Sequence, residues 1–133
     1  MKESFNPELY GYFARIGKAF SNGNRIALLN FLGEGEKSVD ALSSQTGLTV
    51  ANTSQHLQHL RHAGLVESRK NGQHVYYRLT DDYSVMTVID LIQKLALTNL
   101  PELNLLFNDL VKESDSQAIQ QAKHPEQRSY ATA

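Results

Sequence analysis

The sequence predicts a mainly α-helical fold with a small β-hairpin, in the order α-α-α-α-β-β-α. Apolar residues recur at steps of three and four over most of the 133 residues, which indicates amphipathic helices. Turn clusters that contain glycine separate these stretches. One region alone, residues 65–79, has two short β-rich runs around an Asn-Gly dipeptide, which is typical of a tight hairpin.

The first two helices are expected at residues 8–20 and about 24–32. The first has one apolar stripe, formed by Leu9, Tyr12, Phe13, Ile16 and Phe20. The polar turn at 21–24 can cap the second helix, and Gly33 and Gly35 close it. Because the second helix is apolar on several sides, we expect it to lie at the centre of the core.

A short third helix is expected from Ser38 to Gly47, and Thr49 suits the N-cap of a fourth helix that Gly64 ends. The inward residues of the third helix are expected to be Val39, Ala41 and Leu42. The apolar face of the fourth is expected to comprise Val50, Thr53, Leu57 and Leu60. The opposite, polar face consists of Ala51, Asn52, Gln55, His59 and His62, with His56 and Gln58 at its flanks.

After the hairpin, Asp81 can cap a fifth helix, whose apolar stripe kinks or restarts at Pro101 and continues to about residue 112. Residues 114–133 are polar and predict a frayed or disordered tail. We therefore expect one domain over residues 1–113, followed by this tail.

Composition excludes several classes of protein. The chain has no cysteine, so disulfides, thiolate metal sites and cysteine nucleophiles are excluded. No apolar run approaches the roughly 18 residues of a membrane helix, and no secretory signal is visible, so we expect a cytoplasmic protein with no membrane partner. No Gly-rich phosphate loop, His-Glu-x-x-His motif or nucleophile–base pair is present, so we expect no enzyme activity.

The charge is unevenly distributed, although the net charge is only −1. Residues 54–78 hold four of the five histidines. The charged residues of this segment are Arg61, Arg69, Lys70 and Arg78 against Glu67 alone. Such a segment indicates a local contact surface for an anion, while a solvated face is the alternative.

The third helix, its glycine turn and the fourth helix match a helix-turn-helix, and the hairpin would be its wing. A polar helix of this kind fits a major groove about 12 Å wide, where amides and imidazoles reach base edges. On the helix, the expected DNA contacts are Asn52, Gln55 and His59. On the wing, contacts with phosphates or the minor groove are expected from Arg69, Lys70, Asn71, Gln73 and His74.

Two motifs carry a resemblance to a known family. The S-x-H-L-x-x-L-x-x-A-G-L-V run at Ser54–Val66 and the R-K-N-G-x-x-V-Y-Y-R-L run after it resemble the ArsR/SmtB family of bacterial winged helix-turn-helix repressors. The resemblance covers about residues 8–112 and is closest to a subgroup with a downstream rhodanese domain, which is not expected in this chain. It implies a dimer formed by the first and last helices, and a recognition helix over Val50–Ala63 with Ser54, Gln55 and His56 at the DNA.

The chain departs from that family at its sensor sites. The family's CxC position holds Ser38-Val39-Asp40, and residues 81–113 contain no histidine. His56, His59 and His62 could share a metal in principle, but zinc needs three or four ligands and acidic residues nearby are few. We therefore expect no metal and no cofactor. Control by an unknown small-molecule effector, by a partner protein or by protein abundance stays open.

The terminal helices predict dimerisation, because they leave more apolar surface than a monomer of this size can hide. The expected interface comprises Leu9, Phe13, Ile16, Val88, Ile92 and Leu95. We predict a homodimeric repressor that binds an imperfect palindrome in double-stranded DNA. The alternative is a winged-helix protein-interaction or dimerisation module without specific DNA binding. The polar, amide-rich fourth helix argues against it, because protein-binding faces usually present aromatic or aliphatic anchors.

Overall fold

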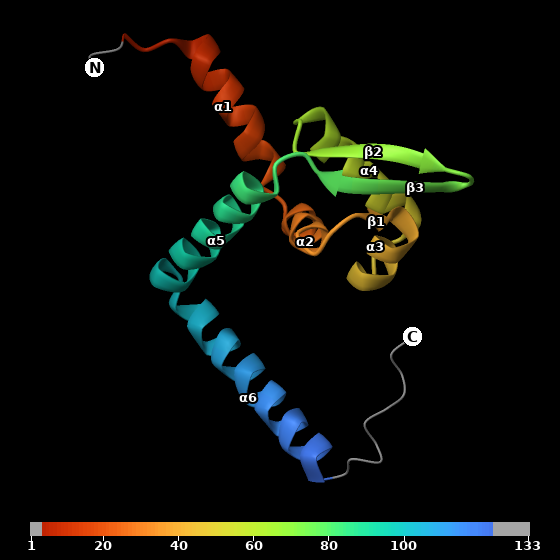
Figure 1. The fold of residues 1–133 in the computed structure, drawn as a ribbon. Coiled ribbons are helices and arrows are strands. Elements are labelled where there is room, and N and C mark those ends of the chain that lie inside the picture. The colour runs from red at the N-terminus through yellow and green to blue at the C-terminus, as the bar shows by residue number, and fades with distance from the viewer. Residues whose placement is uncertain (1–3, 124–133) are drawn as a thin grey trace. The chain divides into compact units, whose positions relative to one another are not determined.

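The computed structural model describes residues 4–123 (Figure 1). In chain order, its elements are α1 (Pro7–Ala19), α2 (Gly23–Leu32), β1 (Lys37–Ser38), α3 (Val39–Thr46), α4 (Val50–His62), β2 (Val66–Asn71), β3 (His74–Leu79), α5 (Asp82–Asn99) and α6 (Pro101–Lys123). The predicted helices and hairpin are confirmed, and β1 was not predicted. The chain divides into two units that meet inside α5, between Asp90 and Leu91. Over the described range, no helix combines the length and apolar character needed to span a membrane.

Polar side chains cap five of the helices. Asn22, Ser38, Thr49 and Asp81 each accept a hydrogen bond from the backbone N–H three residues later, at 3.0–3.2 Å. Asn6 caps α1 in the same way, accepting from two backbone N–H groups at 3.0 and 3.2 Å. The caps of α2, α4 and α5 were predicted from residue type, and the structure confirms them. Ser38 was expected as the start of the third helix, and it is the N-cap of α3.

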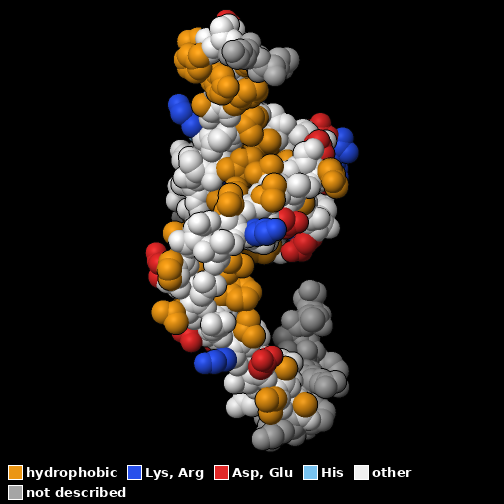
Figure 2. All heavy atoms as spheres, turned by 90° about the vertical axis from the view of Figure 1, so that its left-hand side faces the viewer, with side chains coloured by type: hydrophobic (Ala, Val, Ile, Leu, Met, Phe, Trp, Pro, Cys, Tyr) orange, Lys and Arg blue, Asp and Glu red, His pale blue; other side chains and the backbone are white. Residues whose placement is uncertain are grey.

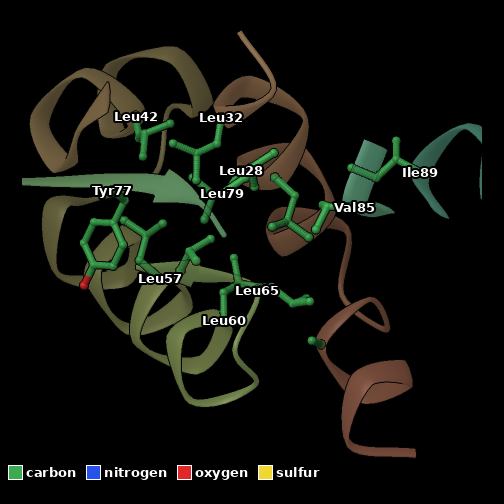
Figure 3. Close-up of a cluster of buried hydrophobic side chains, with 13 residues drawn as sticks. Leu28, Leu32, Leu42, Leu57, Leu60, Leu65, Tyr77, Leu79, Val85 and Ile89 are labelled. Atoms are coloured by element: carbon green, nitrogen blue, oxygen red, sulfur yellow. The ribbon is translucent and has the colours of Figure 1, made fainter. Parts of the chain in front are cut away.

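The core of the first unit lies between α2, α3, α4, the sheet and the start of α5 (Figure 3). Leu28 and Leu29 of α2 are fully buried, which confirms the predicted central position of that helix. Two inward assignments are wrong. Val50 is 51% exposed, because it is the first residue of α4 and extends past the edge of the core. Ala41 is exposed because it lies about 100° around α3 from the buried Leu42.

The three strands form an antiparallel sheet in the order β1-β3-β2, and Figure 1 shows the closed end of the hairpin projecting past the helices. Asn71 pairs with His74, so the two turn residues are Gly72 and Gln73. The hairpin was predicted correctly, but its turn lies one residue later than the Asn-Gly dipeptide. Gly72 has φ +64° and no other described residue of the turn has a positive φ, which fits a turn with glycine first.

The last two helices differ from expectation in length. The restart at Pro101 is confirmed as the first residue of α6. The helix then continues to Lys123 and not to about residue 112, so the expected frayed or disordered tail is wrong for residues 114–123. Three glutamines, two alanines and one lysine make up six of these ten residues, and they favour a helix without a buried face. Residues 124–133 of the expected tail lie outside the described residues.

Candidate nucleic-acid interface

The turn between α3 and α4 is fixed by local hydrogen bonds. Gly47 has φ +75°, a left-handed conformation that ends α3 and redirects the chain. The Ser43 hydroxyl donates to the carbonyl of Leu48 at 2.6 Å. The Thr46 hydroxyl donates to the carbonyl of Leu42 at 2.8 Å and accepts from the Leu48 N–H at 3.3 Å. These bonds give partners to polar groups that would otherwise have none where the two helices meet. They therefore fix the position of α4 relative to α3.

The inner face of α4 anchors it to the core. Leu57 and Leu60 are fully buried. Thr53 is also fully buried, and its hydroxyl donates to the carbonyl of Thr49 at 2.8 Å. The buried hydroxyl therefore has its partner inside the helix, and α4 carries a rigid apolar back.

The outer face of α4 presents the predicted amides and imidazoles. Asn52, Gln55 and His59 are exposed, whereas Ser54 and His56 are half-buried. Ser54 accepts a hydrogen bond from the Gln58 amide at 3.4 Å. The helix contains no acidic residue, so nothing on α4 itself repels a polyanion.

His56 is set apart from the other histidines of α4 by its environment. Partial burial, together with the nearby charges of Arg25 and His59, lowers the pKa of His56. It therefore faces the outside mainly as a neutral ring with one donor and one acceptor, which suits base edges better than phosphates. Among residues 4–123, no three His, Asp or Glu side chains are grouped closely enough to hold a metal ion.

Arg69 at the wing is held by partners that were not predicted. Its Nη2 and Nε donate to the carboxylate of Glu36 at 2.6–3.1 Å, and its guanidinium carbon lies 4.7 Å from the centre of the Tyr76 ring. The hydrogen bonds from Arg69 lower the pKa of Glu36, and the same contact raises the pKa of Arg69. Arg69 thus connects the hairpin to Glu36, and the carboxylate of Glu36 largely neutralises its positive charge.

Two further side chains of the hairpin have acidic partners. Nδ1 of His74 lies 3.3 Å from the carboxylate of Asp40 in α3, and Arg78 pairs with Glu67. Lys70 is exposed and forms no ion pair with any described residue. Of the predicted wing contacts, Arg69 and His74 each have an acidic partner. Lys70, Asn71 and Gln73 are exposed, and Lys70 has no carboxylate partner among the described residues.

A cleft of about 310 Å³ joins α4 to the wing. It brings together Ser54, Arg69 and Lys70, which are far apart in sequence. Gln58 and Arg61 also line it, and Arg61 donates to the Ser68 hydroxyl at 3.4 Å. Sequence reasoning missed the part played by Gln58 and Arg61, although their place one turn after Ser54 and Leu57 could have indicated it. His59 does not reach this cleft and lies in a second one, beside α1.

The residues predicted for a dimer interface carry exposed apolar surface. On α1, Leu9, Phe13 and Ile16 are exposed, and Figure 2 shows hydrophobic side chains gathered over this helix. On α5, Val88 and Leu95 are exposed. Ile92, the sixth predicted residue, is half-buried within the single chain.

Comparison with known proteins gives a consistent result. The model of a family described as bacterial regulatory protein, arsR family, matches residues 22–68. The HTH-type transcriptional regulator Rv0324 of Mycobacterium tuberculosis is 36% identical over 98 residues, which are 74% of this chain and 43% of the relative. The transcriptional activator HlyU of Vibrio cholerae is 41% identical over 78 residues, 59% of this chain and 71% of the relative. This chain therefore spans less than half the length of Rv0324.

Among solved structures, one neighbour is the solution structure of a homodimeric winged helix-turn-helix DNA-binding domain, Mb0332 from Mycobacterium bovis. It is 35% identical to this chain, with a TM-score of 0.63. The match covers 75% of this chain and 94% of the neighbour. The neighbour's fold is the helix-turn-helix and wing described above.

Proposed function

This chain belongs to the ArsR family of bacterial regulatory proteins, and from this premise we propose that it is a homodimeric transcriptional repressor that binds a double-stranded DNA operator. One observation carries the proposal. The outer face of α4 is polar, exposed and free of acidic residues, and it stands on a buried apolar back. A rigid helix with such a face is suited to the major groove.

The side chains divide into two roles. Asn52 and Gln55 carry amides that can pair with adenine through two hydrogen bonds, so we assign them to base edges. The neutral His56 joins them. Lys70 at the wing is assigned to phosphate, because it is exposed and has no ionic partner among the described residues. Asn71 and Gln73 beside it can add neutral hydrogen bonds.

A homodimer is supported by the exposed apolar residues of α1 and α5 and by the homodimeric Mycobacterium bovis domain to which this chain is similar. Two-fold symmetry places two copies of α4 in successive major grooves, so the operator is an imperfect palindrome with half-sites at least one turn apart, roughly 10–10.5 base pairs. A bound dimer that overlaps a promoter excludes polymerase without any further contact surface. Repression therefore needs no surface beyond the DNA contacts and the dimer interface, whereas activation would also need a surface that contacts polymerase.

The test begins with selection of binding sequences from a random duplex library by the full chain. We expect an enriched imperfect palindrome, and a footprint of the same length in a promoter that contains it. A promoter fusion carrying this site should then lose transcription when the protein is present. No enrichment would contradict DNA binding and favour the protein-interaction module. Enrichment with increased transcription would contradict repression alone, and HlyU, whose name is that of an activator, would be the better guide.

We also propose that DNA release is independent of thiol oxidation and of zinc, cobalt, arsenite and cadmium. The chain has no thiol, and the expected CxC position holds Ser38 to Asp40. Anisotropy of a labelled operator complex, titrated with each metal with and without a chelator, should stay constant. Release by equimolar zinc that survives the His59→Gln and His62→Gln changes would contradict this proposal.

A further inference from the structure

A second cleft lies between α1 and the C-terminal end of α4. It has a volume of about 200 Å³ and is lined by Arg15 and Lys18 of α1 and by His59, His62 and Ala63 at the end of α4. Four of these five residues carry a side chain that can donate hydrogen bonds to an anion, and none of them is acidic. The two cations come from a helix that sequence analysis assigned only to dimerisation.

The positive charge of this cleft is not neutralised by the protein. Within residues 4–123, neither Arg15 nor Lys18 forms an ion pair, whereas Arg69 and Arg78 at the wing are each paired with a glutamate. The surroundings of α4 therefore carry more unpaired positive charge on the α1 side than sequence reasoning predicted. An anion entering the cleft meets no carboxylate among the lining residues.

The carbonyl groups at the C-terminal end of α1 accept hydrogen bonds from Arg25 and not from Arg15 or Lys18. Arg25 donates to the carbonyl oxygens of Lys18 at 2.6 Å and Ala19 at 3.0 Å, and so covers the C-terminus of the helix. Arg15 lies over the ring of Tyr12, with 5.7 Å between the guanidinium carbon and the ring centre. This contact leaves the five N–H donors of the guanidinium available.

The place of the cleft along α4 relates it to the proposed base-reading face. His62 follows Gln55 by seven residues, which is about 10 Å along a helix. That length is close to the roughly 12 Å width of a major groove. When Gln55 reaches base edges inside the groove, His59 and His62 approach the wall of the groove, where the sugar-phosphate backbone runs.

We infer that this cleft binds a phosphate of the DNA backbone, with Arg15 and Lys18 of α1 as its charged contacts and His59 and His62 of α4 as its hydrogen-bond donors. The inference rests on the proposed function and adds α1 to the elements that touch DNA. Each subunit then contacts the DNA backbone on both sides of its recognition helix. Lys70 makes the contact on the wing side, and the α1 cleft makes it on the other side. Contacts of this kind fix register without reading sequence.

The experiment compares two double variants with equal loss of charge. Arg15→Gln with Lys18→Gln removes the cations of the cleft. Lys94→Gln with Lys112→Gln removes two lysines of α5 and α6 that do not line it. Affinity for the selected operator is measured from 50 to 200 mM salt for the unchanged protein and for both variants. Circular dichroism and sedimentation establish that each is folded and in the same oligomeric state.

The cleft variant should show a salt dependence that is shallower by about 1.8 in slope, because one phosphate contact per subunit contributes about 0.9. Over this fourfold salt range, the unchanged protein should lose roughly twelvefold more affinity than the cleft variant does. The preference for operator bases should be unchanged. The control variant should keep the slope of the unchanged protein.

Ethylation interference provides the second readout. A phosphate whose ethylation blocks the unchanged protein, but not the cleft variant, would locate the contact. Equal slopes for the cleft variant and the control would overturn the inference while leaving the proposed function intact. Failure of the unchanged protein to bind any duplex would instead overturn the proposed function. Saturable binding of inorganic phosphate to DNA-free protein, together with an unchanged slope, would make the cleft a free-anion site and overturn the DNA contact.

Discussion

Gln55 and Lys70 illustrate how single residues divide the work of recognition. Gln55 is exposed at the centre of the polar face of α4, whereas Lys70 is exposed at the wing. Gln55→Ala should weaken operator binding by about 1–3 kcal/mol and relax the base preference at one position. Lys70→Ala should weaken binding to all sequences equally and make the salt dependence shallower. Anisotropy titrations with the operator and single-base variants measure both effects, and altered base preference in Lys70→Ala alone would reverse our assignment.

The contact between Glu36 and Arg69 predicts a pH effect on stability. Because Arg69 lowers the pKa of Glu36 in the folded state, the ionised carboxylate stabilises the fold at neutral pH. This contribution is present above the ordinary glutamate pKa and is lost as the pH falls through the lower, folded value. Glu36→Gln should therefore be less stable than the unchanged protein at pH 7, and the difference should narrow as the pH falls to 3.

Urea unfolding at pH 7, 5, 4 and 3 measures the free energy of unfolding for this comparison. Glu113→Gln, at an exposed position of α6 without a described ion pair, serves as the control and should stay close to the unchanged protein throughout. A difference for Glu36→Gln that is equal at every pH would show that the carboxylate's charge is not the source of its effect.

The residue types of α4 could be predicted from sequence, but the partners of the wing could not. Helical spacing alone separates Gln55 from Leu57, so the outer face follows from the pattern. Arg69 and His74 contact Glu36 and Asp40, which lie 33 and 34 residues earlier in the chain. No local pattern predicts such pairs, because they arise only when β1 and the start of α3 fold against the hairpin.

At the level of elements, the glycine of the helix-turn-helix can be tested against a glycine inside a helix. Neither Gly47 nor Gly11 has a heavy atom within 4 Å of the position that a Cβ would occupy, so packing does not distinguish them. Gly47 has φ +75°, which disfavours other residues, and Gly47→Ala should destabilise the fold by about 1–2 kcal/mol. Gly11→Ala in α1 should instead stabilise it by about 0.5–1 kcal/mol. Thermal unfolding of the two variants measures the sign of each change in stability. Equal changes for Gly47→Ala and Gly11→Ala would contradict the explanation from backbone conformation.

Elements with a clear period or a cap were predicted well, and the exceptions have physical reasons. Strand β1 has only two residues, Lys37 and Ser38, too few to show alternation. The hairpin turn lies one residue later than the Asn-Gly dipeptide because pairing of Val66 with Leu79 sets the register. Helix α6 extends past its apolar stripe, because alanine, glutamine and lysine make up six of the ten residues 114–123 and favour a helix without a buried face.

For the molecule as a whole, apolar surface is the strongest argument for a second copy of the chain. Phe13 of α1 and Leu95 of α5 are 57% and 63% exposed in the single chain. Isolated exposed apolar residues are ordinary, but stripes that recur along a helix indicate an interface. Half-buried Ile92 is a poorer probe of dimerisation, because a charge there would also disturb the packing of one chain.

Leu95→Glu should therefore dissociate the proposed dimer without unfolding its subunits. In the single chain the new carboxylate faces solvent, whereas in a dimer it would be buried without a partner. The control is Gln93→Glu, an exposed position of α5 about 160° around the helix from Leu95. Sedimentation at micromolar concentration should give a folded monomer for Leu95→Glu and a dimer for the control and the unchanged protein. A monomer for the unchanged protein would contradict the dimer itself, and a stable Leu95→Glu dimer would remove α5 from the interface.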